Sequence, residues 1–113
     1  MLDDVASVTL QSAISALSTR QQVTANNIAN IETPGFIASS VDFESSLAAA
    51  ISAGNPAASQ VSVNATTLTP GINGNNVDLA TELTTATKTT LQEQLLTSAL
   101  TSQYGLLATV MKG

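Results

Sequence analysis

The sequence predicts a mainly α-helical fold, in which two long terminal helices pair as an antiparallel coiled coil and flank an irregular middle segment. Apolar residues recur at helical spacing near both ends of the chain, whereas glycine, proline and asparagine gather in the middle. One tyrosine and two phenylalanines are the only aromatic residues among 113. Because bulky side chains are so few, the core must be thin. We therefore expect each terminal helix to depend on its neighbours for stability.

The first segment, residues 1–33, is predicted to form an amphipathic helix from about Asp3 to Asn30. Apolar and small polar residues alternate at steps of four and three along it, as in a coiled-coil seam. Asp3 and Asp4 favour a helix start, because negative charge is stabilised at a helix N-terminus. The residues that we expect to pack in this seam are Leu10, Ile14 and Leu17.

Three asparagines stand near the end of this helix, although asparagine is a poor helix former. Asn30 can cap the helix, because asparagine tolerates the left-handed conformation. We expect Asn26 and Asn27 to bond backbone groups of other chains at a crowded interface, the alternative being that they are simply exposed. Pro34 and Gly35 then fit the two central positions of a type II turn.

The middle segment, residues 34–76, is predicted to be irregular. Val41 to Ile51 reads as a short helix, and the stretch around Val61 and Val63 alternates apolar and polar residues as a weak strand does. The following sequence TPGINGNN reads as a loop. A long stretch with little regular structure is usually functional or ordered by partners.

The last segment, residues 77–113, is predicted to be a long helix that Asp78 caps, and the three segments together form a single domain. Several threonines weaken this helix, because β-branched residues lose side-chain freedom in a helix. Its apolar stripe is broad enough to touch more than one helix. The residues that we expect to pack along it are Leu79, Leu83, Leu91, Leu95, Leu100, Leu107 and Val110.

Composition excludes several classes of function. The net charge is −5 and the three basic residues are scattered, which disfavours binding to nucleic acid or to anionic lipid. The chain has no cysteine and no histidine, and we predict no cofactor, no metal and no small-molecule substrate. A small enzyme that uses Asp42 and Glu44 is the weak catalytic alternative. The N-terminus lacks the pattern of a cleaved signal peptide, so any export is expected to proceed without one.

The stretch RQQVTANNIANIETPGF, from Arg20 to Phe36, closely resembles the N-terminal signature of the flagellar axial proteins, which build the rod and hook. The signature-matching residues expected at a subunit interface are Asn26, Asn27, Ile28, Asn30, Thr33, Pro34, Gly35 and Phe36. The sequence GNNVDLATEL, from Gly74 to Leu83, and the ending LLATVMKG resemble the B-type subfamily of proximal rod proteins. The departures are Glu32, where asparagine or aspartate is usual, and Phe36, where tyrosine is more common.

The resemblance implies a structural, non-enzymatic rod subunit of the basal body, in the periplasmic space of the cell envelope. Its implied partners are other rod and basal-body proteins and the flagellar type III export gate. Phe43 and Leu47 are similar to the short motif by which such subunits engage that gate, although two apolar residues one helical turn apart can equally pack the short helix onto its neighbours. The alternative function is a secreted helical-hairpin adaptor or effector that forms a finite heterodimer.

Overall fold

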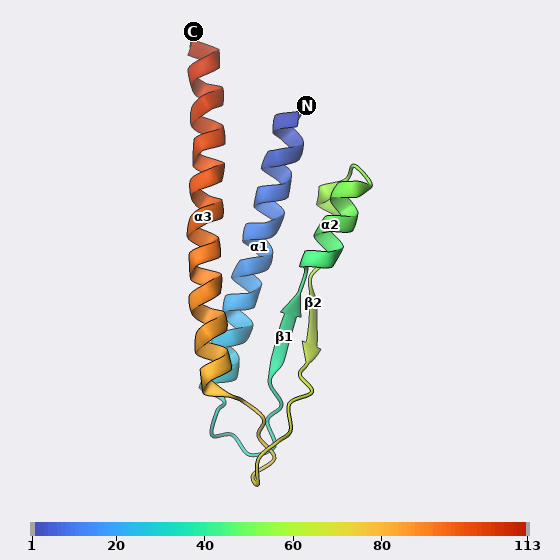
Figure 1. The fold of residues 1–113 in the computed structure, drawn as a ribbon, viewed down its shortest axis with the longest axis vertical. Coiled ribbons are helices and arrows are strands. Elements are labelled where there is room, and N and C mark those ends of the chain that lie inside the picture. Colours follow the sequence, from blue (N-terminus) through green and yellow to red (C-terminus); the bar gives the residue numbers. More distant parts are fainter. Residues whose placement is uncertain (1, 113) are drawn as a thin grey trace.

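The computed structural model describes the backbone of residues 2–112 and the side chains of residues 5–103, 105 and 109. The described elements, in chain order, are α1 (Leu2–Ala29), β1 (Ser39–Asp42), α2 (Glu44–Ser52), the 3-10 turn η1 (Pro56–Ala58), β2 (Ser62–Ala65) and α3 (Leu79–Lys112). The molecule is elongated, with extents of 64 × 26 × 14 Å. Figure 1 shows α1 in the middle, with α3 along one side and β1, β2 and α2 along the other.

The two long helices run antiparallel and pack against each other, which confirms the predicted fold class (Figure 1). Their bounds lie within two residues of the predicted ones. Asp78 precedes α3 and accepts bonds from the Ala80 N–H (3.2 Å) and the Thr81 hydroxyl (2.8 Å), as expected of a helix cap. Across residues 2–112, no helix combines the length and apolar character that a bilayer span needs.

The middle segment is more ordered than predicted. β1 pairs with β2 in antiparallel register, with Val41 opposite Val63, so the expected weak strand has a partner. The predicted helix from Val41 is wrong at its start, because residues 41 and 42 belong to β1 and α2 begins at Glu44. Pairing with a strand distant in sequence outweighs the local helix signal at these positions.

The hydrophobic core lies between α1 and the segment formed by β1 and α2, which we call the arm. Its buried members are Ala13, Ala16, Leu17, Val41 and Phe43, and the partly buried residues packed on them are Val23, Leu47 and Leu96. The alanines let the arm approach α1 closely, and they also limit how much apolar area is buried. This is the thin core that the composition predicts.

The contact between α1 and α3 is largely polar. Thr24, Asn27, Glu82 and Thr89 are buried there, and the Thr89 hydroxyl is satisfied by the carbonyl of Thr85 in its own helix (2.7 Å). On the α1 side, Leu17 is buried, whereas Leu10 and Ile14 are half-buried. Polar side chains therefore fill much of the seam in place of the leucines expected from α3.

The prediction that the leucines of α3 pack in this helix pair is wrong for four of them. Leu79, Leu83, Leu91 and Leu95 are 44%, 51%, 61% and 70% exposed. The reason is that α3 turns its Glu82–Thr89 side toward α1, which rotates these leucines away. Leu100 is half-buried, and the side chains of Leu107 and Val110 lie outside the described residues.

Candidate functional site

Asn27 ties three elements together near the end of α1. Its carboxamide accepts a bond from the Ser39 N–H (3.0 Å) and donates to the Ser39 carbonyl (2.7 Å), so it pairs with the backbone of β1 much as a neighbouring strand would. The same Nδ2 lies 3.1 Å from each carboxylate oxygen of Glu82, at the start of α3. Asn27 is 1% exposed and Glu82 is 7% exposed. A buried carboxylate so close to a helix N-terminus also benefits from the helix dipole.

Asn75 closes the exposed end of α1. Its Nδ2 donates to the carbonyls of Asn30 and Thr33, both at 2.8 Å, in the turn where α1 ends. Its Oδ1 accepts the Val77 N–H at 2.8 Å. These two carbonyls follow the last residue of α1 and also accept the N–H groups of Thr33 and Phe36 (3.0 and 3.2 Å), so Asn75 adds a second bond to each from a distant part of the chain.

The next residue, Asn76, binds the start of the hairpin. Its Oδ1 accepts the Ala38 N–H at 2.6 Å, and its Nδ2 donates to the Thr66 hydroxyl and to the Leu68 carbonyl. Its own N–H donates to the Phe36 carbonyl (3.2 Å). Asn75 and Asn76 are therefore two adjacent buried side chains that hold the helix end and the hairpin in one piece.

Two glycine turns, at Gly35 and Gly74, lie against each other. Gly35 has φ +74° and the Phe36 N–H bonds the Thr33 carbonyl (3.2 Å), which confirms the predicted turn at Pro34–Gly35. Gly74 has φ +78°, and a Cβ placed on it would lie 3.2 Å from the Cα of Gly35. Position 74 therefore favours glycine for two reasons, its positive φ and the lack of space for a Cβ atom.

Arg20 joins α1 to the start of α2. It bonds both Glu44 carboxylate oxygens (2.7 and 3.1 Å) and the Val41 carbonyl (2.7 Å), and its guanidinium lies 4.9 Å from the centre of the Phe43 ring. The hydrogen bond from Arg20 lowers the pKa of Glu44 below its usual value. This cluster fixes the arm against α1 next to the core.

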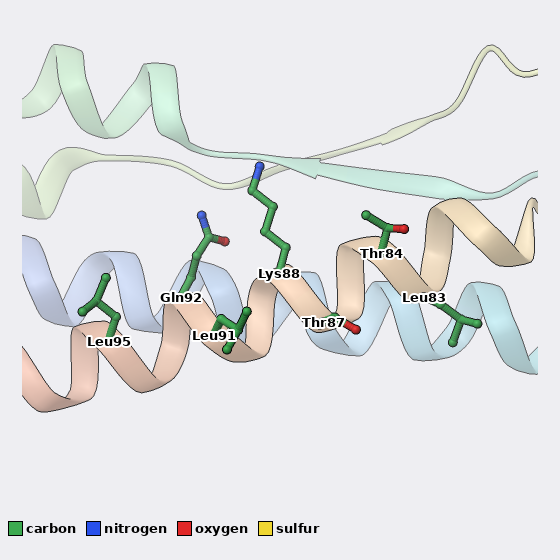
Figure 2. Close-up of a pocket in the computed structure, with 7 residues that line it drawn as sticks. All are labelled: Leu83, Thr84, Thr87, Lys88, Leu91, Gln92 and Leu95. Atoms are coloured by element: carbon green, nitrogen blue, oxygen red, sulfur yellow. The ribbon is translucent and has the colours of Figure 1, made fainter.

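Four exposed leucines of α3 and one exposed threonine follow one another at steps of four residues. We call this row the leucine face: Leu79, Leu83, Thr87, Leu91 and Leu95. At 3.6 residues per turn, Thr87 lies about 160° around the helix from the buried Thr89, so the face points away from α1. Figure 2 shows Leu83, Leu91 and Leu95 along α3, with Lys88 directed toward the strands. Successive steps of four residues make an oblique ridge, which is the geometry that packs into the groove of another helix.

The signature residues divide between these features. Asn27 bonds its own chain, so the expectation that it serves other chains is wrong for this conformation. The expected left-handed cap at Asn30 is also wrong, because within residues 2–112 only glycines have positive φ. Its side chain instead bonds Asn26 and Thr33 in the final turn. Asn26, Thr33, Pro34 and Gly35 are exposed, while Ile28 and Phe36 are half-buried.

The two residues of the expected export motif lie in the core. Phe43 is 7% exposed and precedes α2, and the partly buried Leu47 packs against the core one turn later. The packing alternative therefore describes their place in the folded chain. Asp42 and Glu44 do not form an acidic site, since Glu44 is occupied by Arg20, and no metal-ligating group of three side chains occurs among the described residues.

Sequence reasoning missed Asn75, Asn76, Glu82 and the role of Arg20. The asparagines stand in a glycine-rich stretch, where they read as turn residues. A usable signal was present: the segment from Gly74 to Leu83 carries part of the family resemblance, which a mere loop does not require.

Comparison with known proteins defines the class. The sequence model of the family described as flagella basal body rod protein matches residues 9–36, which cover most of α1 and the Pro34–Gly35 turn. The flagellar basal body rod protein FlgB of Escherichia coli K12 is 34% identical over 82% of this chain and 83% of its own length, and that of Shigella flexneri gives the same values. FlgB of Cereibacter sphaeroides is 32% identical over 84% of each chain.

The chain therefore belongs to the family of flagellar basal body rod proteins. Its relatives place it with the B type, and it is a structural subunit of the basal body rod. The alternative of a soluble adaptor finds no support among them.

Proposed function

We propose that this rod subunit joins a neighbouring subunit through the leucine face of α3, and that burial of this face supplies much of the free energy of assembly. The supporting observation is the exposure of four leucines in a row that crosses the side of α3 opposite α1. Each leucine contributes about 1.5–3 kcal/mol when it passes from full exposure to full burial. Leaving the row in water is unfavourable, and a second helix is the partner whose shape fits an oblique i, i+4 ridge.

A contact of this kind suits a rod. Stacking subunits in one direction requires that different surfaces of each subunit meet, so the contact repeats without closing. On the neighbouring subunit, the surface that receives the leucine face is proposed to include exposed signature residues near the end of α1. These residues are Asn26, Thr33, Pro34 and Gly35. The partners are copies of this chain or other rod proteins of the basal body.

The test is a double substitution, Leu91→Gln with Leu95→Gln. Because these side chains are 61% and 70% exposed, the variant should fold and melt like the wild type. It should fail to enter basal bodies, and cells that carry only this variant should be non-motile. Ile72→Gln is the matched control, because Ile72 is fully exposed in a loop away from the leucine face. Normal incorporation of the double variant would contradict the proposal.

We further infer that the chain is exported by the flagellar type III apparatus, without a cleaved signal peptide, before it folds. In this proposal the export gate recognises Phe43 and Leu47, and burial of Phe43 at 7% exposure leaves little of that side chain to recognise in the folded state. Arg20 also fixes this segment against α1, through its ion pair with Glu44 and its contact with the Phe43 ring. The motif is thus accessible only in the unfolded or opened chain, which then folds and assembles in the periplasmic space.

Phe43→Ala and Leu47→Ala test this export step. Each should reduce secretion while synthesis in the cell stays unchanged. Val41→Ala is the matched control, because Val41 lies in the same core with the same 7% exposure but outside the motif. The control should be secreted normally even if its fold is weakened. Equal losses of secretion for all three variants would show that folding, and not recognition, is the sensitive step.

A further inference from the structure

We propose that two copies of this chain pair through the open edge of β2, forming a closed dimer that precedes entry into the rod. This interaction is independent of the leucine face. The hairpin of β1 and β2 is the only strand pair among the described residues, and its two edges differ in how they are covered.

The outer edge of β2 presents unpaired backbone groups. In an antiparallel pair, opposite residues alternate between bonded and non-bonded pairs. The Thr66 N–H bonds the Ala38 carbonyl (2.8 Å), and in the register of Asn64 opposite Ser40 the bonded residues of β2 are therefore the even-numbered ones. The N–H and carbonyl of Val63 and Ala65 consequently point away from β1.

The outer edge of β1 is closed by α1. Asn27 takes both the N–H and the carbonyl of Ser39, and Arg20 takes the carbonyl of Val41. Figure 1 shows β1 between α1 and β2, so that no further strand fits on this side. Each chain thus offers one edge for pairing, and pairing between two chains uses both.

Apart from its short length of four residues, the open edge carries none of the usual protective features. Natural edge strands are commonly blocked by lysine, proline or a bulge. Here residues 45–77 contain no charged side chain, and the exposed residues of the strand region include Val61 at 42% and Val63 at 52%. The pairing with β1 runs without interruption from Ser39 to Asp42, so β2 has no bulge.

A second copy is the occupant that these features favour. The chain has a net charge of −5, so two copies repel each other at most surfaces, whereas the neutral segment can approach itself freely. Antiparallel pairing centred on Val63 sets Val63 opposite its own copy and Ser62 opposite Asn64. The valine pair Val41–Val63 of each chain then joins into one row across a four-stranded sheet, which is more stable than an isolated hairpin.

The geometry makes this dimer finite and separate from the rod contact. Since α1 covers the other edge, the sheet cannot grow past two chains. A two-fold contact also reverses the direction of the second copy, whereas rod subunits point the same way. The interface of one short strand per copy is small, so we expect a weak, reversible association that yields to assembly.

Cysteine pairing tests the register, because the wild type has no cysteine. In the proposed dimer, positions 62 and 64 of different copies form a non-bonded pair with Cα atoms about 4.5 Å apart, which suits a disulfide. Position 62 of one copy lies about 8 Å from position 62 of the other, which is too far. Mixed S62C and N64C chains should therefore cross-link under mild oxidation, and either variant alone should not. Equal cross-linking in all samples, or none, would overturn the proposed pairing.

A charge at the strand centre tests the association without cysteines. Val63→Lys sets like charges directly opposite each other, and it should weaken dimerisation measured by analytical ultracentrifugation at least about fivefold. Gln60→Lys adds the same charge just outside the strand and should change dimerisation far less. The leucine-face variant with Leu91→Gln and Leu95→Gln should still dimerise. A monomeric wild type at high concentration would refute the proposal, and loss of dimer in the leucine-face variant would reassign the contact to α3.

Discussion

Asn27→Ala should destabilise the chain severely, because this one carboxamide of α1 satisfies groups in two other elements, β1 and α3. Its removal leaves the Ser39 N–H and carbonyl, which it bonds at 3.0 and 2.7 Å, without partners. It also removes the amide donor that bonds the buried Glu82 carboxylate. An unsatisfied buried polar group costs about 1–3 kcal/mol and a charged one costs more, so we expect a loss of about 3–6 kcal/mol. Domains of this size are stable by only about 5–15 kcal/mol, so the loss is a large fraction of the total.

The neighbouring residue provides the control. Asn26 occupies the adjacent position in α1 but is exposed. Asn26→Ala should change the free energy of unfolding by no more than about 0.5 kcal/mol, as surface substitutions usually do. Urea unfolding followed by circular dichroism measures both variants. If the free energy of unfolding of Asn27→Ala lies within about 1 kcal/mol of the wild-type value, the hydrogen bonds of Asn27 are not what holds the hairpin to α1 and α3.

Three further predictions concern the junction and the arm. Gly74→Ala should destabilise more than Gly35→Ala in thermal melts, because both have φ near +75° but only the former meets backbone at 3.2 Å, and equal losses would contradict this reason. Asn75→Ala should cost about 1–3 kcal/mol in urea and increase amide exchange at the end of α1, whereas unchanged exchange would show that the cap is dispensable. The lowered pKa of Glu44 contributes stability above its unfolded pKa, near 4.5, which is lost as pH falls through the folded pKa. Glu44→Gln should therefore reduce the loss of unfolding free energy on acidification by about 0.2–1 kcal/mol. An unchanged pH profile would show that the Arg20–Glu44 pair does not contribute to this loss.

The elements that depend on local signals could be predicted from the sequence. Apolar spacing predicts both long helices, Asp78 caps α3, and Pro34–Gly35 turns the chain as its residue types require. Each of these signals lies within a few residues of the structure that it specifies. The antiparallel arrangement also follows, because the segment between the helices contains the turns that bring them back together.

The face by which α3 meets α1 could not be predicted in this way. Leucines at helical spacing are normally the best candidates for a helix-pair seam, and here they form the outward row. The choice is made by long-range bonds: Gln21 reaches the Thr90 hydroxyl at 2.7 Å and Asn27 reaches Glu82 at 3.1 Å. Such pairs, separated by more than fifty positions, leave no trace in the local periodicity.

The asparagines of the 71–76 loop were hidden for a related reason. Asn75 caps a helix that ends more than forty residues earlier, and Asn76 bonds the backbone that leads into β1. A turn-rich sequence predicts the loop itself but does not indicate which distant carbonyls its side chains satisfy. The same applies to Arg20, whose partners Val41 and Glu44 are brought to it only by the core around Leu17.

The distribution of side chains in this fold suits the proposed assembly through the leucine face. Polar side chains make specific bonds inside the chain and fix its shape, while large apolar side chains on α3 face outward. A chain that used its leucines internally would be more stable alone and would have little apolar surface left for a neighbour. Because hydrogen bonds contribute only about 0.5–1.5 kcal/mol each, the present arrangement defines one conformation at low stability. In the proposed function, the stronger and less directional apolar contribution is then available for the contact between subunits.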